Sequence, residues 1–283
     1  MAKHINNNDS VLIVGSDGTI GQRLVMALQT AGENVLQTTR YRGLKDEQRI
    51  FLDLSEDMGQ WALPPDPIKT AILCAAVTSL EKCRINPDYS RKVNVNGTVA
   101  LAKRLVDSGG FVVFISTNLV FDGQKPFAKS TDPVNPLTEY GRQKVEAESL
   151  LSKLGNKVSI VRFSKILSAD TPIFHDWIRD LKAGKEIHPF FDMVMSPVPL
   201  AFAVDVLFKV AMMQTPGIMQ VSAEQDISYA EAALRIARKL GLDEKLINPV
   251  SYRESGIEFA PLHTTLNVSR LRSELGMVPP EVF

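Results

Sequence analysis

Short apolar runs rich in β-branched residues alternate with longer amphipathic stretches through the first 165 residues. Most of the runs are apolar at successive positions, which is typical of a strand covered by helices on both faces. The alternation predicts βαβ units and therefore a parallel sheet. The strands expected are 10–15, 34–39, 49–53, 70–76, 110–117 and 157–163, and the helices between them are 21–31, 88–107 and 139–154.

The alternation becomes irregular after residue 165, where prolines multiply and helical patterns recur at 173–183, 199–214 and 228–240. We therefore predict an α/β protein with a Rossmann-type doubly wound parallel sheet and a smaller C-terminal substrate lobe. The first domain is expected at 1–165, with a return segment near 196–224, and 166–283 is expected to form mainly the smaller lobe. A cleft between two such lobes is a natural place for a substrate.

The composition narrows the classes of partner. With 32 basic and 32 acidic residues the formal net charge is zero, so we expect neither a nucleic-acid nor a membrane partner. No apolar run approaches the length of a membrane span, and the N-terminus lacks a signal-peptide core, which predicts a cytoplasmic protein. The two cysteines, Cys74 and Cys83, are expected to be free thiols. The four histidines lack ligand spacing, so no metal site is expected.

A glycine-rich segment, "GSDGTIG", follows the first predicted strand and begins the first helix. Such a turn places backbone N–H groups and the positive end of a helix dipole against a phosphate, although a tight turn without a ligand is the alternative. Asp17 is an unusual neighbour for a pyrophosphate, and we expect it to point away from the phosphate or to cap the helix. The residues predicted to contact a dinucleotide here are Gly15, Asp17, Gly18, Thr19, Ile20 and Gly21.

Further cofactor contacts are expected where the second, third and fourth strands end. Arg40 and Arg42 follow the second strand, where an arginine suits the 2′-phosphate of NADP and an acid would suit NAD. We therefore predict NADP(H) in preference to NAD(H), while a solvated arginine pair is the alternative. Asp53 and Leu54 end the third strand near the expected adenine position. The small residues after the fourth strand, which would let the ribose approach closely, are Cys74, Ala75 and Ala76.

The candidate chemistry lies in "FISTNLVFDG" and "PLTEYGRQKVEAE". Tyr140 and Lys144 are four residues apart and share one face of a helix, where the ammonium is expected to lower the pKa of the phenol. Ser116 and Thr117 end the fifth strand, and only one of the two hydroxyls can face the ligand side. The combination predicts an acid–base site beside the dinucleotide.

These motifs, together with "CAAVTSLEKCRINPDYSRKVNVNGT", "FDMVMSPVPLAFAVDV" and "TTLNVSRLRSELG", resemble an extended short-chain dehydrogenase/reductase. The closer likeness is to the dTDP-4-dehydrorhamnose reductase branch, which includes the regulatory beta subunit of methionine adenosyltransferase. The resemblance implies an NADPH-dependent reductase of a keto sugar, with a nucleotide-activated sugar as the expected substrate, and leaves a homodimer open. It implies that Thr117, Tyr140, Lys144 and Asn94 form the catalytic set, with Tyr140 and Lys144 also contacting the cofactor. The substrate contacts it implies are Asn118, Val120, Asp192 and Ser196.

The chain departs from the family pattern at several pocket positions. Asn118 replaces an acid, Leu119 and Phe127 stand where the family has tyrosines, and Val198 ends the family's "SPT". Each change makes the expected sugar pocket less polar. Two alternatives to the reductase therefore stay open: a cofactor-binding regulatory subunit that turns over nothing, and a sugar-nucleotide epimerase or dehydratase that regenerates its cofactor.

Overall fold

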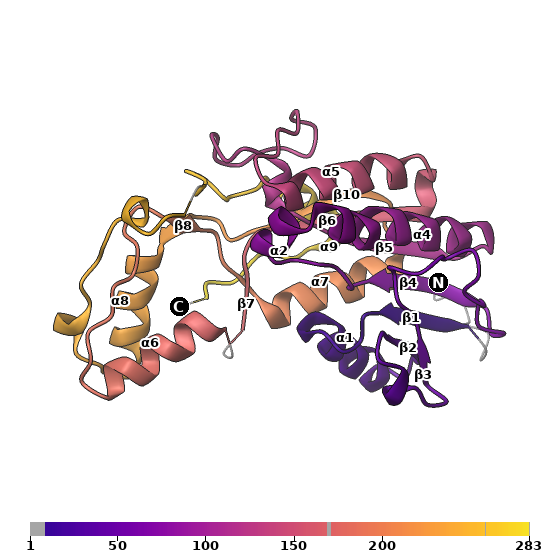
Figure 1. The fold of residues 1–283 in the computed structure, drawn as a ribbon, viewed down its shortest axis with the longest axis horizontal. Helices are drawn as coiled ribbons and strands as arrows, with labels where there is room; N and C mark the ends of the chain where they lie inside the picture. The colour runs from indigo at the N-terminus through magenta and orange to yellow at the C-terminus, as the bar shows by residue number, and fades with distance from the viewer. Residues whose placement is uncertain (1–8, 169–170, 258, 283) are drawn as a thin grey trace. The chain divides into compact units, whose positions relative to one another are not determined.

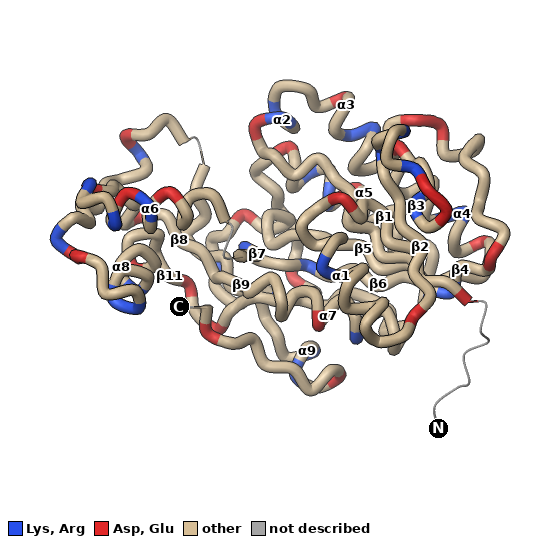
Figure 2. Tube along the Cα trace, turned by 90° about the horizontal axis from the view of Figure 1, so that it is seen from below, with Lys and Arg blue, Asp and Glu red and all other residues tan. Residues whose placement is uncertain are grey.

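The fold comes from a computed structural model that describes residues 9–168, 171–257 and 259–282 (Figure 1). The chain divides into two compact units. The first contains the N-terminal part up to Val120 together with 136–162 and 204–219, and the second contains 121–135, 163–203 and 220–283. Figure 2 shows basic and acidic residues interspersed along the trace, in keeping with the formal net charge of zero.

The first unit is built on a seven-stranded sheet with the strand order β10-β6-β5-β4-β1-β2-β3. The β1–β2, β1–β4, β2–β3 and β4–β5 pairs are parallel. The strand order reverses beside β1, and this is the doubly wound topology that the sequence predicts. The strands are β1 (Ser10–Val14), β2 (Asn34–Thr39), β3 (Arg49–Phe51), β4 (Ile68–Leu73), β5 (Phe111–Thr117), β6 (Val158–Phe163) and β10 (Gly217–Val221).

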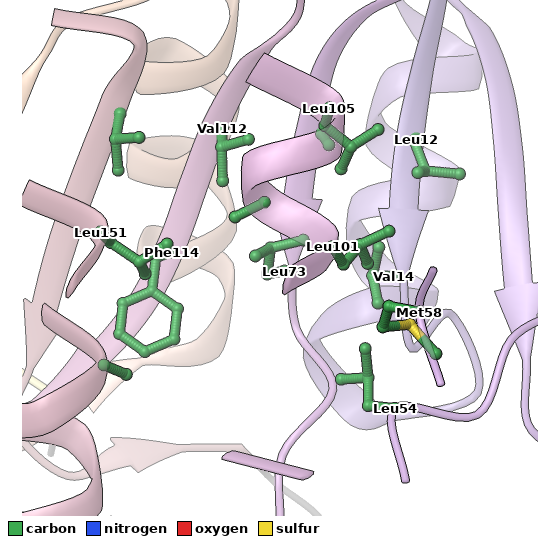
Figure 3. Close-up of a cluster of buried hydrophobic side chains, with 14 of the residues drawn as sticks. Leu12, Val14, Leu54, Met58, Leu73, Leu101, Leu105, Val112, Phe114 and Leu151 are labelled. Carbon is green, nitrogen blue, oxygen red and sulfur yellow. The ribbon is translucent and has the colours of Figure 1, made fainter. Parts of the chain in front are cut away.

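Helices cover the sheet because the strands are apolar on both faces. In Figure 1, α4 and α5 lie on one side of the sheet and α1 on the other. Leu101 and Leu105 of α4 pack on Leu12, Leu73 and other strand residues in a buried cluster (Figure 3). The helical elements are α1 (Thr19–Thr30), α2 (Leu80–Ile85), α3 (Pro87–Arg91), a π-helical turn η2 (Lys92–Gly97), α4 (Thr98–Asp107), α5 (Glu139–Ser152) and α7 (Leu200–Met213), with short 3₁₀ turns η1 (Arg42–Leu44), η3 (Asn118–Val120) and η4 (Gly155–Lys157).

The second unit has its own core between two amphipathic helices. Trp177 of α6 contacts Phe174 and Tyr229, with ring centroids 5.4 and 6.4 Å apart. Short two-residue strands pair as β8–β11 and β7–β9. The elements are β7 (Ile166–Leu167), α6 (Pro172–Lys182), β8 (Val194–Met195), β9 (Val198–Pro199), β11 (Ile227–Ser228), α8 (Tyr229–Leu240), η5 (Glu244–Leu246), η6 (Tyr252–Glu254) and α9 (Ser269–Leu275).

Candidate active site

The glycine loop is shaped by close contacts at its two ends. Gly15 has a positive φ of 85°, and a Cβ there would lie 2.8 Å from the backbone nitrogen of Ala75. A Cβ on Gly21 would overlap the carbonyl oxygen of Gly15, so only glycine lets α1 begin this close to β1. Gly18 caps α1 without any side-chain hydrogen bond. The first N–H groups of a helix have no acceptor within the helix, so this turn can receive a phosphate.

A cavity of about 310 Å³ opens beside the loop in the first unit. This volume is within the usual range of small-molecule sites. Of the predicted cofactor residues, the cavity is lined by Gly15, Asp17, Gly18, Arg40, Asp53, Leu54, Cys74, Ala75 and Ala76. The predicted residues that are absent from its described lining are Thr19, Ile20, Gly21, Arg42, Tyr140 and Lys144.

The two predicted arginines lie in different surroundings. Arg40 lines the cavity, and its Nη2 donates to the hydroxyl of Tyr41 at 3.0 Å, which raises the pKa of Arg40 further. Arg42 instead pairs with Glu56 at 3.0 Å and stacks over the ring of Phe51 at 3.8 Å. Arg40 is therefore the arginine available to an anion in the cavity.

Sequence reasoning missed several lining residues. Thr38 accepts a hydrogen bond from the Gly15 backbone N–H at 2.9 Å, and Tyr41 adjoins Arg40. Both lie at the end of β2, and that position alone could have indicated them. Tyr89 comes from α3, and no periodic signal pointed to it. The remaining lining residues are Val14, Leu52, Val77 and Val93.

Asn94 lies in the π-helical turn and fixes the segment that lines the cavity. Its amide oxygen accepts from the Val77 backbone N–H at 2.7 Å, and its amide nitrogen donates to the Val77 carbonyl at 2.9 Å. The same nitrogen donates to Gln143 Oε1 at 2.9 Å, which links this segment to α5. Asn94 thus holds backbone in place, and π-turns of this kind are frequent at functional sites.

The predicted acid–base residues come from β5 and α5 of the same unit. The N-cap of α5 is Thr138, whose hydroxyl accepts from the Gly141 N–H at 3.1 Å and places Tyr140 in the first turn. Gly141 is required because a Cβ there would overlap the Leu119 carbonyl oxygen. Lys144 lies one turn later, with its Nζ 5.7 Å from the centroid of the Tyr140 ring.

The environment of Lys144 explains its electrostatics. The ammonium donates to the Ile115 carbonyl at 2.8 Å and lies 4.3 Å from the centroid of the Phe114 ring. Burial lowers the pKa of Lys144 to about 8, opposed by the charge of Glu148. Burial also raises the pKa of Tyr140. The lowered tyrosine pKa expected from the sequence is therefore wrong for this structure, because desolvation of the phenol dominates.

The two hydroxyls that end β5 have separate partners. Ser116 donates to Glu148 Oε1 at 2.5 Å, inside a buried group in which Arg162 Nη2 donates to Glu148 Oε2 at 2.6 Å. Thr117 accepts from the Leu119 N–H at 3.2 Å and remains the hydroxyl not committed to this buried pair. Strand alternation left the choice between the two hydroxyls open, and the family resemblance implied Thr117.

The predicted substrate residues are divided between the units. Asn118 and Val120 form the turn after β5, and Val120 is fully buried. In the second unit, Asp192 accepts from the Ser251 hydroxyl at 2.5 Å and from the Tyr252 N–H at 2.9 Å. The Ser196 hydroxyl donates to the Ala223 carbonyl at 3.0 Å. Each of these last two side chains is thus bound within its own unit.

The described part of the chain has neither a metal-binding cluster nor a membrane-spanning helix. Among the described residues, no group of three or more histidine, cysteine, aspartate or glutamate side chains is placed to hold a metal ion. No helix within the described ranges has both the length and the apolar character needed to cross a bilayer.

Comparison with known proteins identifies the class to which this fold and site belong. The family model of the RmlD substrate binding domain matches residues 9–282. The chain therefore belongs to this family, whose curated relatives and structural neighbours include dTDP-sugar reductases of the extended short-chain dehydrogenase/reductase type.

Three curated relatives illustrate the range of the family. The chain is 28% identical over 275 residues to the spore coat polysaccharide biosynthesis protein SpsK of Bacillus subtilis, covering 95% of this chain and 92% of that protein. It is 26% identical over 285 residues to the dTDP-4-dehydrorhamnose reductase of Aggregatibacter actinomycetemcomitans, covering 96% and 95%. It is 26% identical over 155 residues to the bovine methionine adenosyltransferase 2 subunit beta, covering 55% and 46%.

Solved structures share the fold. The structure of a dTDP-4-dehydrorhamnose reductase from Clostridium acetobutylicum superposes with a TM-score of 0.83 at 25% identity, covering 96% of this chain and 95% of that one. A dTDP-4-dehydrorhamnose reductase from Bacillus anthracis, solved in complex with NADP, gives a TM-score of 0.83 at 23% identity over 96% and 94%. These likenesses confirm the predicted fold class.

Proposed function

We propose that this chain is an NADPH-dependent reductase of a nucleotide-activated keto sugar, with Tyr140 as the proton donor. Membership of the family and the names of its full-length relatives support a sugar-nucleotide reductase. The single observation that carries the chemistry is the Tyr140–Lys144 pair, which lies on one helix in the same unit as the cavity.

The residues of the cavity fit a phosphorylated dinucleotide. The turn at Gly15 and Gly18 supplies backbone N–H groups at the start of α1, where a diphosphate is favoured by the helix dipole. The guanidinium of Arg40 could pair with a 2′-phosphate, because its hydrogen bond with Tyr41 holds it beside the cavity. Cys74, Ala75 and Ala76 leave space for the ribose.

In the proposed reaction, bound NADPH supplies the hydride that reduces the carbonyl carbon of the substrate. Tyr140 transfers the proton of its hydroxyl to the carbonyl oxygen, and its raised pKa keeps the phenol protonated at neutral pH until then. The Lys144 ammonium stabilises the phenolate that this transfer leaves. Thr117 donates a hydrogen bond to the same carbonyl oxygen.

The substitution Tyr140→Phe tests this mechanism. We expect turnover of a verified keto-sugar substrate to fall by about 10²–10⁴-fold, which is the usual contribution of a general acid. The dissociation constant for NADPH should stay within about twofold of the native value, because the described cavity lining does not include this side chain. Turnover at the native rate in the variant would show that the proton comes from another group.

A second candidate function is a cofactor-binding regulatory subunit without turnover. The observation in its favour is the similarity to methionine adenosyltransferase 2 subunit beta. A panel of dTDP-, UDP- and GDP-linked keto sugars separates the two. NADPH consumption with any of them supports the reductase, and NADPH binding without consumption across the panel supports the regulatory subunit. Conversion of a sugar nucleotide without net NADPH consumption would instead indicate an epimerase or dehydratase.

A further inference from the structure

The carboxylate of Asp17 is the feature of the glycine loop that the proposed function leaves unexplained. Asp17 lines the same cavity as Gly15 and Gly18, where the diphosphate of a dinucleotide would lie. Two anionic groups in such a cavity repel each other, and partial burial strengthens the repulsion. For this loop to bind a diphosphate, another group must therefore orient the Asp17 carboxylate away from the phosphate or compensate its negative charge.

Capping of α1 does not account for Asp17. The N-cap is Gly18, and no side chain accepts a capping hydrogen bond. Asp17 uses its backbone carbonyl to accept from Gln22 Nε2 at 2.9 Å, which leaves the carboxylate to make its own contacts. The capping alternative considered from the sequence is therefore wrong, and the direction of the carboxylate has to be explained by another group.

That group is Arg49, the first residue of β3. Its Nη1 lies 3.8 Å from Asp17 Oδ1, and the two side chains are 32% and 27% exposed. Pairing of β2 with β3 sets Arg49 opposite Gln37, and Arg49 Nη2 donates to Gln37 Oε1 at 3.4 Å. The sheet register thus places the guanidinium beside the glycine loop.

The contacts of Arg49 are not those expected of an arginine that only stabilises the fold. Among the described residues its Nε is buried without a hydrogen-bond partner, and its contacts with Asp17 and Gln37 are both long. Buried donors are nearly always satisfied, and exceptions are found where a group has a function. Both arginines at the end of β2 have other partners, Tyr41 for Arg40 and Glu56 for Arg42.

We infer that Arg49 is a positioning residue of the cofactor site, which draws the Asp17 carboxylate toward β3 and compensates its charge so that the loop can accept a dinucleotide diphosphate. The inference rests on the proposed function only in that the cavity takes an anionic dinucleotide. It also accounts for an aspartate among the glycines, because the acid and its counter-charge act as one neutral pair.

The test measures dissociation constants for NADPH and NADH with the full chain, using Arg49→Met, Asp17→Asn and the double variant. Arg49→Met keeps an unbranched, mainly aliphatic stem and removes the guanidinium with its charge, and we expect it to weaken binding of both cofactors about tenfold. Adding Asp17→Asn should restore binding to within about threefold of native, because the uncompensated carboxylate is then gone. Arg23→Met, which removes an exposed arginine from α1, is the matched control and should change binding less than twofold.

Several results would overturn the inference. Native-like binding by Arg49→Met, or a loss that Asp17→Asn does not restore, would show that Arg49 does not act through Asp17. A loss confined to NADPH would show that Arg49 reads the 2′-phosphate instead. If Arg49→Met fails to fold, Arg49→Lys replaces it and should bind within about threefold of native, since it keeps the compensating charge; a tenfold loss would count against the inference. Failure of the native chain to bind either cofactor would contradict the proposed function itself. This outcome is distinguishable from the results above, which concern the variants and overturn only the role of Arg49.

Discussion

At the scale of single residues, a buried charged group lies behind the candidate acid–base pair. Glu148 accepts from both Arg162 and Ser116, and the Glu148 and Arg162 side chains are 6% and 3% exposed. A buried ion pair of this kind adds little net stability, although breaking it by removing one partner usually costs about 3–5 kcal/mol. Glu148 lies one turn beyond Lys144 on α5, where its charge favours the protonated lysine.

The pH dependence of the proposed reaction follows from Lys144. The groups whose charges act on it are Glu148, Cys83 and Cys74, and burial outweighs them to lower its pKa to about 8. A lysine is cationic below its pKa and neutral above it. We therefore expect kcat/KM to be constant below about pH 8 and to fall about tenfold per pH unit above it, as the cation beside Tyr140 is lost.

The measurement is a pH profile of kcat/KM, with two variants. Residual activity of Lys144→Met should show no decline near pH 8. Lys165→Met is the control, because Lys165 is a second lysine whose pKa is lowered by burial and which belongs to the second unit. A decline near pH 8 that persists in Lys144→Met would assign it to another group.

At the scale of elements, the junction between η2 and α4 is tightly packed. A Cβ on Gly97 would overlap the carbonyl oxygen of Leu54, which belongs to the cavity lining. We expect Gly97→Ala to lower the free energy of unfolding by about 3 kcal/mol, because backbone must move to relieve the overlap. Urea denaturation gives the value. Gly43→Ala, at a glycine with open space around it, should change stability by less than about 0.5 kcal/mol.

The first unit was largely predictable from its sequence pattern. The strand at 34–39 has the predicted bounds, and the helix at 139–152 ends two residues before the prediction. These elements were easy to recognise because a parallel sheet is buried on both faces, so most of its strands are continuous apolar runs that contrast with the amphipathic helices between them. The single helix predicted at 88–107 is instead α3, the π-turn η2 and α4, since Gly97 and Asn94 are fitted to neighbouring backbone that periodicity cannot report.

Other elements lacked a signal in the sequence. The strands β7, β8, β9 and β11 are two residues each, too short for any period to appear. The helices α2 and α9 were also missed. In the site, glycines and strand ends pointed to the cavity, because chain order places them at one edge of the sheet. Tyr89 joins the cavity lining and Arg49 approaches Asp17 only in the folded chain, and no local sequence pattern records these tertiary positions.

At the scale of the whole molecule, cofactor preference should appear as stabilisation against unfolding. A ligand that binds only the folded chain adds about 2.7 kcal/mol when present at 100 times its dissociation constant. Because Arg40 lines the cavity, we expect NADPH to raise the melting temperature more than NADH at equal concentration. Equal or larger stabilisation by NADH would contradict the predicted preference for NADP(H).

The division into two units also bears on how such a protein can change over evolutionary time. The chain passes from one unit to the other after Val120, Asn135, Arg162, Ala203 and Met219. A single recombination event exchanges one contiguous stretch of sequence. Because each unit is made of several separate stretches, one such event could not replace a whole unit with the corresponding unit of a relative. Acquiring a whole unit from a relative would therefore take more than one recombination event, whereas a single event could exchange one segment of a unit.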